Sequence, residues 1–200
     1  MSCEVTTGDP LGAGELARLA ALHAACLPRS ILSELGHATL ARYYAFARAA
    51  GDETIVVGRI DGEVQAALVV SRAPGTLLRR FASQAPASLA VALARRLVAS
   101  GELRRRCWSR LRERPGPDLD LPEVVQIFTD PGHRGRGIGS QLLRSCEDIL
   151  RRACLPAYCI HTHADGNEAG IRFYRREGFT VIGEARSFGD RFVVMKKGLA

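Results

Sequence analysis

The sequence predicts a mixed α/β fold in which a twisted, partly antiparallel sheet is flanked by helices. Its 200 residues are 46% hydrophobic and 24% charged, which suits one domain with a real core. Two runs of β-branched residues, at 54–60 and 64–70, enclose Asp61-Gly62, a strong signal for a two-residue hairpin. After residue 123, strand and helix patterns alternate. A hairpin followed by this alternation favours a mixed sheet over a fully doubly wound one.

The first fifty residues contain one candidate strand and two predicted helices. Residues 3–7 alternate weakly and are compatible with a first strand. Asp9-Pro10 is typical of a helix start, and apolar side chains spaced for one face extend that helix to about Cys26. Pro28 ends it, and a second helix is predicted over 38–50.

A basic segment separates the third predicted strand from the next one. Residues 72–114 contain 11 Arg and 2 Glu, a balance of +9, whereas the whole chain carries +7, so the remainder carries −2. Pro86 and Gly101 divide the segment into two or three predicted helices, and Pro115-Gly116-Pro117 begins a linker. We therefore expect one domain over 1–200, with a basic helical insertion and linker over 72–117.

The helices of this insertion have apolar residues on one face and arginines on the other. Leu89, Leu93 and Leu97 recur at i, i+4 and i+8. Two interpretations remain open: a helical lid with its arginines in water, or a surface that docks onto an anionic membrane over 72–114. Nucleic-acid binding is disfavoured because no known nucleic-acid motif accompanies the charge.

The last eighty residues carry the clearest pattern. Strands are predicted over 123–129, 158–162, 179–182 and 192–195, and helices over 137–153 and 167–177.

The turn after the strand at 123–129 is rich in glycine. Residues 132–139 include four glycines, three of them alternating at Gly135, Gly137 and Gly139. No side chain at these positions blocks a ligand, and the free N–H groups and dipole of the following helix attract anions. Arg134 and Arg136 add charge. The spacing matches neither a P-loop nor a dinucleotide-binding fingerprint, and it predicts a pyrophosphate site.

Two motifs at matching separation carry a family resemblance. Arg134-x-x-Gly137-x-Gly139 resembles the acetyl-CoA-binding motif of the GNAT superfamily of N-acetyltransferases. Residues 167–179 resemble the second family motif, N-x-x-A-x-x-F-Y-x-x-x-G-F, with Gly170 where alanine is usual. This glycine is expected only to loosen the helix slightly. The resemblance covers about 123–197 well and the first half loosely, and it implies a GNAT-like fold.

The resemblance implies acetyl-CoA as co-substrate and names its contacts. The strand 123–129 would splay from its neighbour, and pantetheine would lie in the gap against Ile127, Phe128 and Thr129, with an N–H near Phe128 polarising the thioester carbonyl. Asn167 would cap its helix and touch the cofactor, or cap alone. The pyrophosphate would sit on Arg134, Gly135, Arg136, Gly137, Ile138, Gly139 and Ser140.

Two residues match catalytic positions of the family. Glu123 opens the strand at a position where many members carry Glu, so it is the candidate general base; a solvated strand-entry residue is the alternative. Tyr174 matches the tyrosine that protonates the coenzyme A sulfur and would also contact the cofactor; core packing is the alternative. His161 and His163 alternate on one strand and share a face. No third ligand accompanies them, so no metal is expected, and His163 is a candidate substrate contact or base.

The implied activity is acetyl transfer to a primary amine by direct attack in a ternary complex, with a non-catalytic acetyl-CoA sensor as a second class. Residues 27–36 loosely resemble a segment of acetyltransferases associated with bacterial surface-polysaccharide gene clusters. Ser33 and Glu34 are therefore expected to touch the acceptor. An amino sugar or envelope precursor is the preferred acceptor, and a peptide or protein N-terminus or a small amine is the alternative.

The location follows from what the sequence lacks. Residues 1–10 show no signal-peptide pattern, no stretch of 18 apolar residues occurs, and the six cysteines include no C-x-x-C pair. We expect a cytoplasmic protein, peripheral at the membrane if the insertion docks there, and either a monomer or a homodimer.

Overall fold

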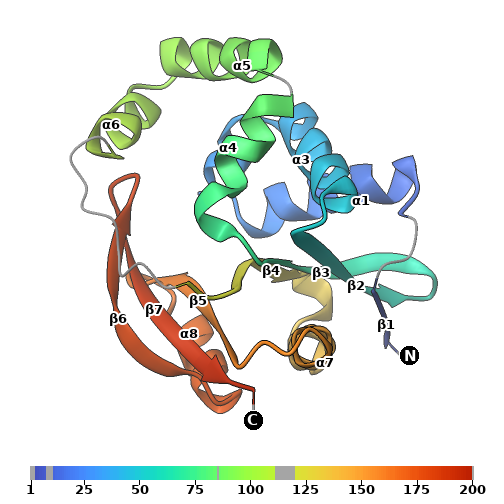
Figure 1. Cartoon of the computed structure of the whole chain (residues 1–200). Coiled ribbons are helices and arrows are strands. Elements are labelled where there is room, and N and C mark those ends of the chain that lie inside the picture. Colours follow the sequence, from blue (N-terminus) through green and yellow to red (C-terminus); the bar gives the residue numbers. More distant parts are fainter. Residues whose placement is uncertain (1–2, 8–10, 85, 111–119, 200) are drawn as a thin grey trace.

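A seven-stranded sheet organises the computed structural model of the chain, which describes residues 3–7, 11–84, 86–110 and 120–199 (Figure 1). The strand order is β1-β2-β3-β4-β5-β7-β6. β4 and β5 are parallel, and every other neighbouring pair is antiparallel. The predicted mixed sheet is confirmed. The strands are β1 (Cys3–Thr7), β2 (Glu53–Ile60), β3 (Glu63–Ser71), β4 (Glu123–Thr129), β5 (Ala157–His163), β6 (Thr180–Ser187) and β7 (Asp190–Gly198).

The described helices match the predicted ones to within a few residues, with two exceptions. The short helix α2 was not predicted; it forms because the Ser30 side chain accepts a hydrogen bond from the Ser33 amide. The expected start at Asp9-Pro10 lies outside the described residues, and the helix begins at Ala13, where the Glu15 carboxylate accepts from the Gly12 amide. The helices are α1 (Ala13–Cys26), α2 (Ile31–Glu34), α3 (His37–Ala49), α4 (Pro74–Gln84), α5 (Pro86–Ala99), α6 (Gly101–Arg110), α7 (Ile138–Arg152) and α8 (Glu168–Arg176).

Both faces of the central strands are covered. α1, α3 and α4 pack on one face around Tyr43, Tyr44 and Phe81, and α7 packs on the other around Leu142 and Leu143 (Figure 1). From Ala66 to Val70 the residues of β3 alternate between these two cores, as the period of a strand requires. The sheet therefore has two covered faces: the α1/α3 face, under α1, α3 and α4, and the α7 face, under α7.

The basic insertion forms three helices that arch over the α1/α3 face toward the β6–β7 hairpin (Figure 1). α4 is anchored by the buried side chains of Leu77 and Phe81, and α6 by the buried Leu103. α5 has no buried residue. No helix in the described ranges is long and apolar enough to cross a bilayer.

Candidate active site

The parallel strands β4 and β5 part soon after they begin. They pair only at Glu123 with Cys159 and at Val124 with Ile160, whereas β5 pairs with β7 along its whole length. The later residues of β4 therefore have no β5 partner, and a V-shaped gap opens toward the carboxyl ends of the two strands. Ile127, Phe128 and Thr129, predicted to contact pantetheine, line the β4 side of this gap.

The other edge of β4 carries an irregularity. Val69 of β3 pairs with Gln126 and Val70 pairs with Val124, so Val125 is an extra residue on β4. A bulge of this kind leaves one residue unpaired and re-aims the backbone. It lies three residues before Phe128, near the closed end of the gap.

The glycines after β4 are required for two different structural reasons. Gly135 and Gly137 both adopt φ +76°, a left-handed conformation in which a side chain is strained. Gly139 does not; a Cβ there would lie 3.1 Å from Cζ of Phe173, so this glycine lets α8 approach α7. The alternating pattern thus sets the path of the loop and the packing of the next helix.

The start of α7 presents free backbone donors to the open end of the gap. The first backbone hydrogen bond of the helix runs from the Gln141 amide to the Gly137 carbonyl at 3.1 Å. The amides of Ile138, Gly139 and Ser140 precede it and have no helical acceptor. The Ile138 side chain is buried in the core, so this residue offers only its amide. These donors and the helix dipole form an anion site.

The polar side chains of the loop are less free than the sequence suggested. Arg134 and Arg136 are exposed, but Nε of Arg134 donates to the Thr129 carbonyl at 3.2 Å. The Ser140 hydroxyl donates to the Glu177 carboxylate at the end of α8. The site therefore offers the three backbone amides together with the guanidinium of Arg136 and the remaining N–H groups of Arg134.

Tyr174 on α8 is buried beneath the gap. Its ring packs edge-on against Phe179 with centroids 5.6 Å apart, and Phe173 lies 5.2 Å away. Burial raises the pKa of the phenol, so Tyr174 keeps its proton at neutral pH. The same burial makes the phenol a weaker acid than in water, so its proton can pass to the sulfur only as the carbon–sulfur bond breaks and negative charge builds there.

Asn167 occupies the N-cap position of α8 without capping it. Its side-chain amide donates instead to Oγ1 of Thr162 on β5 at 2.7 Å. A Cβ at Gly170 would lie 2.6 Å from Oδ1 of Asn167. The glycine that was expected only to loosen the helix thus provides the space in which the Asn167 amide lies.

Glu123 contacts His161 across the closed end of the gap. Oε1 of Glu123 lies 2.8 Å from Nδ1 of His161, and the two side chains are 17% and 29% exposed. Both lie on the α1/α3 face, opposite α7. From the sequence we placed His161 and His163 on one face of the strand, but we named only His163 as a candidate. The contact between His161 and Glu123 was not predicted because the two residues are 38 positions apart.

The site thus combines a V-shaped gap between β4 and β5, a turn that leads into free backbone amides, and the Glu123 carboxylate at the vertex of the gap. The sequence profile described as "Acetyltransferase (GNAT) family" matches residues 17–179. The chain belongs to the GNAT family.

Curated relatives of this GNAT chain match over a shorter stretch. It is 36% identical over 75 residues to a mycothiol acetyltransferase of Acidimicrobium ferrooxidans, which covers 38% of this chain and 24% of the relative. It is 36% identical over 87 residues to a mycothiol acetyltransferase of Mycobacterium sp. strain JLS, covering 42% and 27%. The chain thus spans about a quarter of the length of the curated relatives that it matches.

Solved GNAT structures share the fold at low sequence identity. An N-acetyltransferase from Staphylococcus aureus Mu50 superposes with a TM-score of 0.64 at 14% identity, with 100% of both chains covered. The PaiA N-acetyltransferase from Thermoplasma acidophilum, in complex with coenzyme A, gives 0.59 at 14% identity, with 99% of both chains covered. These likenesses establish the fold.

The rim of this GNAT site joins three distant segments through Arg106 of α6. Its guanidinium contacts the Glu34 carboxylate, Oδ2 of Asp190 at 3.1 Å and the Arg29 carbonyl at 3.0 Å. Asp190 also binds Arg29 at 2.6 Å. The end of the insertion is therefore bound both to the α1–α2 region and to the β6–β7 turn.

The three predicted acceptor contacts lie at or near this rim. Ser33 donates to the Leu27 carbonyl at 2.8 Å and Glu34 is ion-paired, so both side chains have internal partners. His163 packs against Phe192 with ring centroids 4.6 Å apart. Burial lowers the pKa of His163, which keeps its ring neutral at pH 7.

A buried polar network was missed by sequence reasoning. His23 is fully buried, with Nδ1 2.8 Å from the Tyr44 hydroxyl and Nε2 2.8 Å from Oγ of Ser30. Tyr44 in turn donates to Oε1 of Gln126 on β4 at 3.1 Å. Burial lowers the pKa of His23 to about 4. The network ties the α1–α2 loop to β4, and a lone histidine in an apolar helix pattern gives no sign of it.

No cluster of three or more potential metal ligands occurs among the described residues.

Proposed function

We propose that the chain is an acetyl-CoA-dependent N-acetyltransferase that acts on a primary amine. The observation that carries the proposal is the gap between β4 and β5, which ends at one side in the free amides of α7 and at the other in the Glu123–His161 pair. A donor with a pyrophosphate and an extended thioester arm fits this arrangement. Such a donor would place its reactive end beside a carboxylate.

The backbone holds the donor. The amides of Ile138, Gly139 and Ser140 bind the pyrophosphate, and Arg134 and Arg136 screen its charge. The unpaired edge of β4 hydrogen-bonds the amide groups of pantetheine, as a neighbouring strand would. The backbone around the Val125 bulge lies near the vertex and supplies an N–H for the developing oxyanion.

Glu123 accepts the proton that the acceptor amine must lose. The His161 contact fixes the orientation of the carboxylate, as an orienting partner does for a general base. The neutral amine then attacks the thioester carbonyl carbon directly, and the carbon–nitrogen bond forms before the carbon–sulfur bond breaks. Tyr174 gives its phenolic proton to the departing thiolate. Glu123 passes its proton to solvent, and the second proton that the nitrogen loses as the tetrahedral intermediate collapses restores the Tyr174 phenol through solvent. One proton is thus released for each acetyl group transferred.

An amino sugar is the proposed acceptor class. The rim of the site is polar, with carboxylates at Glu34 and Asp190, hydroxyls at Ser30 and Ser33, and the neutral ring of His163. A surface of this kind can exchange its internal hydrogen bonds for those of a hydroxyl-rich acceptor.

Thiol release tests the proposal. Purified protein is mixed with acetyl-CoA and, in separate reactions, with glucosamine, an alanine-initiated peptide and spermidine. Coenzyme A release fastest with glucosamine supports the amino-sugar assignment, and faster release with the peptide replaces it. Intersecting initial-rate lines indicate a ternary complex, whereas parallel lines reject direct attack. Saturable acetyl-CoA binding without release from any amine would favour a sensor over an enzyme.

A further inference from the structure

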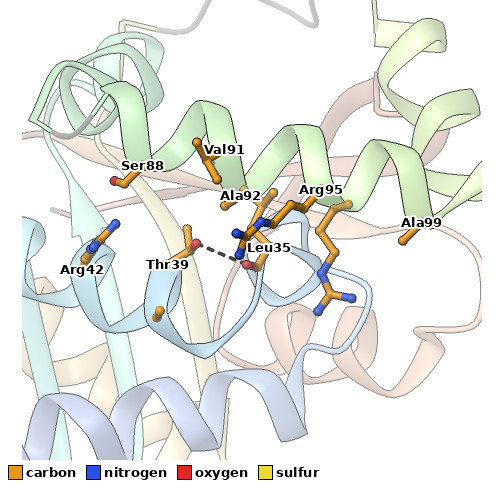
Figure 2. A pocket seen from close by; sticks show the side chains of 10 residues that line it. Leu35, Thr39, Arg42, Ser88, Val91, Ala92, Arg95 and Ala99 are labelled. Carbon is orange, nitrogen blue, oxygen red and sulfur yellow. Dashed lines mark hydrogen bonds between the residues drawn. The ribbon is translucent and has the colours of Figure 1, made fainter.

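A groove of about 460 Å³ lies between α3 and α5, outside the site described above (Figure 2). One wall is the outer face of α3 and the preceding turn, where the lining residues recur at helical spacing. The other wall is the face of α5 that is turned toward α3. The lining residues are Leu35, Ala38, Thr39, Arg42, Ser88, Val91, Ala92, Arg95, Arg96 and Ala99.

Three of the lining residues are arginines, and no carboxylate lines the groove. Within the described ranges, Arg42, Arg95 and Arg96 form no ion pair, whereas Arg80, Arg105 and Arg106 of the same insertion each bind a carboxylate. In the part of the chain that the structure describes, the charges of Arg80, Arg105 and Arg106 are thus neutralised, whereas those of the three groove arginines are uncompensated.

The surroundings of Arg96 add to this excess. Its Nη2 atom lies 3.8 Å from where a Cβ of Gly36 would be, and Gly36 is the N-cap of α3. The N-terminal end of a helix carries partial positive charge, so a guanidinium is unfavourable there without an anion between them.

Apart from the three arginines, Thr39 and Ser88, the residues that line the groove are apolar. Leu35, Val91 and Ala92 face it, and the Thr39 hydroxyl is already bound to the Leu35 carbonyl at 3.2 Å (Figure 2). α5 contributes no buried side chain, and Val91 is 51% exposed. A ligand with an apolar part would cover this surface.

α3 separates the groove from the catalytic face. Its residues Leu40, Tyr43 and Tyr44 are buried toward the sheet, whereas Ala38 and Arg42 line the groove. The two sites can therefore be occupied at the same time.

We propose that the α3/α5 groove binds a phosphate or carboxylate group attached to a short apolar chain. Arg95 and Arg96 on α5, with Arg42 on the facing wall, supply the positive charge for the oxyanion, and the apolar side chains take the chain. The ligand is either a soluble amphiphile or the headgroup region of an anionic lipid, since both present the same chemistry.

Calorimetric titration of the full chain with hexyl phosphate tests the site. The titration is done with coenzyme A at saturation, so that the phosphate-binding turn before α7 does not contribute. We expect saturable binding of one hexyl phosphate, at least tenfold tighter than inorganic phosphate, and no binding of hexylamine. Absence of saturable binding, or equal affinity for inorganic phosphate, would overturn the proposal.

A matched pair of variants shows whether the groove itself is responsible. Arg95→Ala with Arg96→Ala should weaken hexyl phosphate binding at least tenfold. Arg79→Ala with Arg144→Ala removes the same charge from exposed positions outside the groove. This control variant should change the affinity for hexyl phosphate less than twofold. Equal losses in the two double variants would show binding to net charge alone and would contradict a groove site. Circular dichroism checks that both variants fold.

Vesicle sedimentation then separates the two sources. The ligand is a lipid if the wild-type chain co-sediments with phosphatidylglycerol vesicles and the Arg95/Arg96 double variant does not. Neither protein should then co-sediment with phosphatidylcholine vesicles. If hexyl phosphate binds and no vesicle does, it is a soluble amphiphile. Vesicle binding that is unchanged in the groove variant, without hexyl phosphate binding, would reject the site. None of these measurements depends on acetyl transfer.

Discussion

Nδ1 of His161 lies 2.8 Å from Oε1 of Glu123, and the two residues stand on adjacent strands at the point where those strands begin to part. The contact fixes the carboxylate at the vertex of the gap. It also makes the carboxylate and the imidazole one unit, so that changing either residue alters the other.

Replacing Glu123 with Gln should lower kcat by about a hundredfold, because an amide cannot accept the amine proton. His161→Gln should cause a smaller loss, and the double variant should lose less than the product of the two, because the residues are in contact. Steady-state thiol release measures both. Glu63→Gln, at an exposed strand start, serves as the control. Multiplicative losses would show that the two residues act independently.

Tyr174→Phe should reduce kcat by roughly a hundredfold and leave acetyl-CoA affinity nearly unchanged, because only the transferable proton is removed. Tyr158→Phe is the matched control: its ring also packs on Phe179, with centroids 5.1 Å apart, but its hydroxyl binds Glu147 at 2.8 Å. That variant should lose about 1–3 kcal/mol of unfolding free energy and keep its kcat. Full activity in Tyr174→Phe would assign Tyr174 to packing.

Gly137→Ala should destabilise the protein by about 1–2 kcal/mol, because the residue holds φ +76°. It should also weaken acetyl-CoA binding by shifting the amides at the start of α7. Gly14→Ala, in α1 with open space around its Cα, should instead stabilise by about 0.5–1 kcal/mol. Urea unfolding and cofactor titration measure both effects. An unchanged affinity in Gly137→Ala would argue against the loop as the donor site.

His23 should make stability depend on pH. Because burial lowers its pKa to about 4, the folded chain keeps His23 neutral while the unfolded chain protonates it below about 6.5. The unfolding free energy should therefore fall by roughly 3 kcal/mol from this residue as pH drops from 6.5 to 4. His23→Gln should remove that part of the slope, and His37→Gln, at an exposed site, should retain it. Equal slopes in the two variants would contradict the assignment.

The fold was predictable where local chemistry decides it. The strand 123–129 has the predicted bounds because Pro122 and Asp130-Pro131 delimit a β-branched run. The hairpin of β2 and β3 was predictable in the same way, because the Asp61-Gly62 turn between two β-branched runs is a local signal. The course of the insertion could not be predicted, since it depends on contacts of Arg106 with Glu34 and Asp190, 72 and 84 residues away.

The site was predictable as a set of motifs and less so as a set of contacts. The family resemblance named the glycine turn, Tyr174 and Glu123 from the sequence alone, and their roles stay predictions. The partner of Glu123, the Val125 bulge and the space above Gly170 arise from the pairing of strands and the packing of side chains. Periodicity in one segment carries no information about which residue of another segment lies opposite.

The turn before α7 leads into three main-chain N–H groups without a helical acceptor, and its two left-handed residues have no side chain. The direction in which those N–H groups point thus depends on the left-handed backbone at Gly135 and Gly137. A single methyl group at Gly135 or Gly137 would disturb it more than the loss of any one charge.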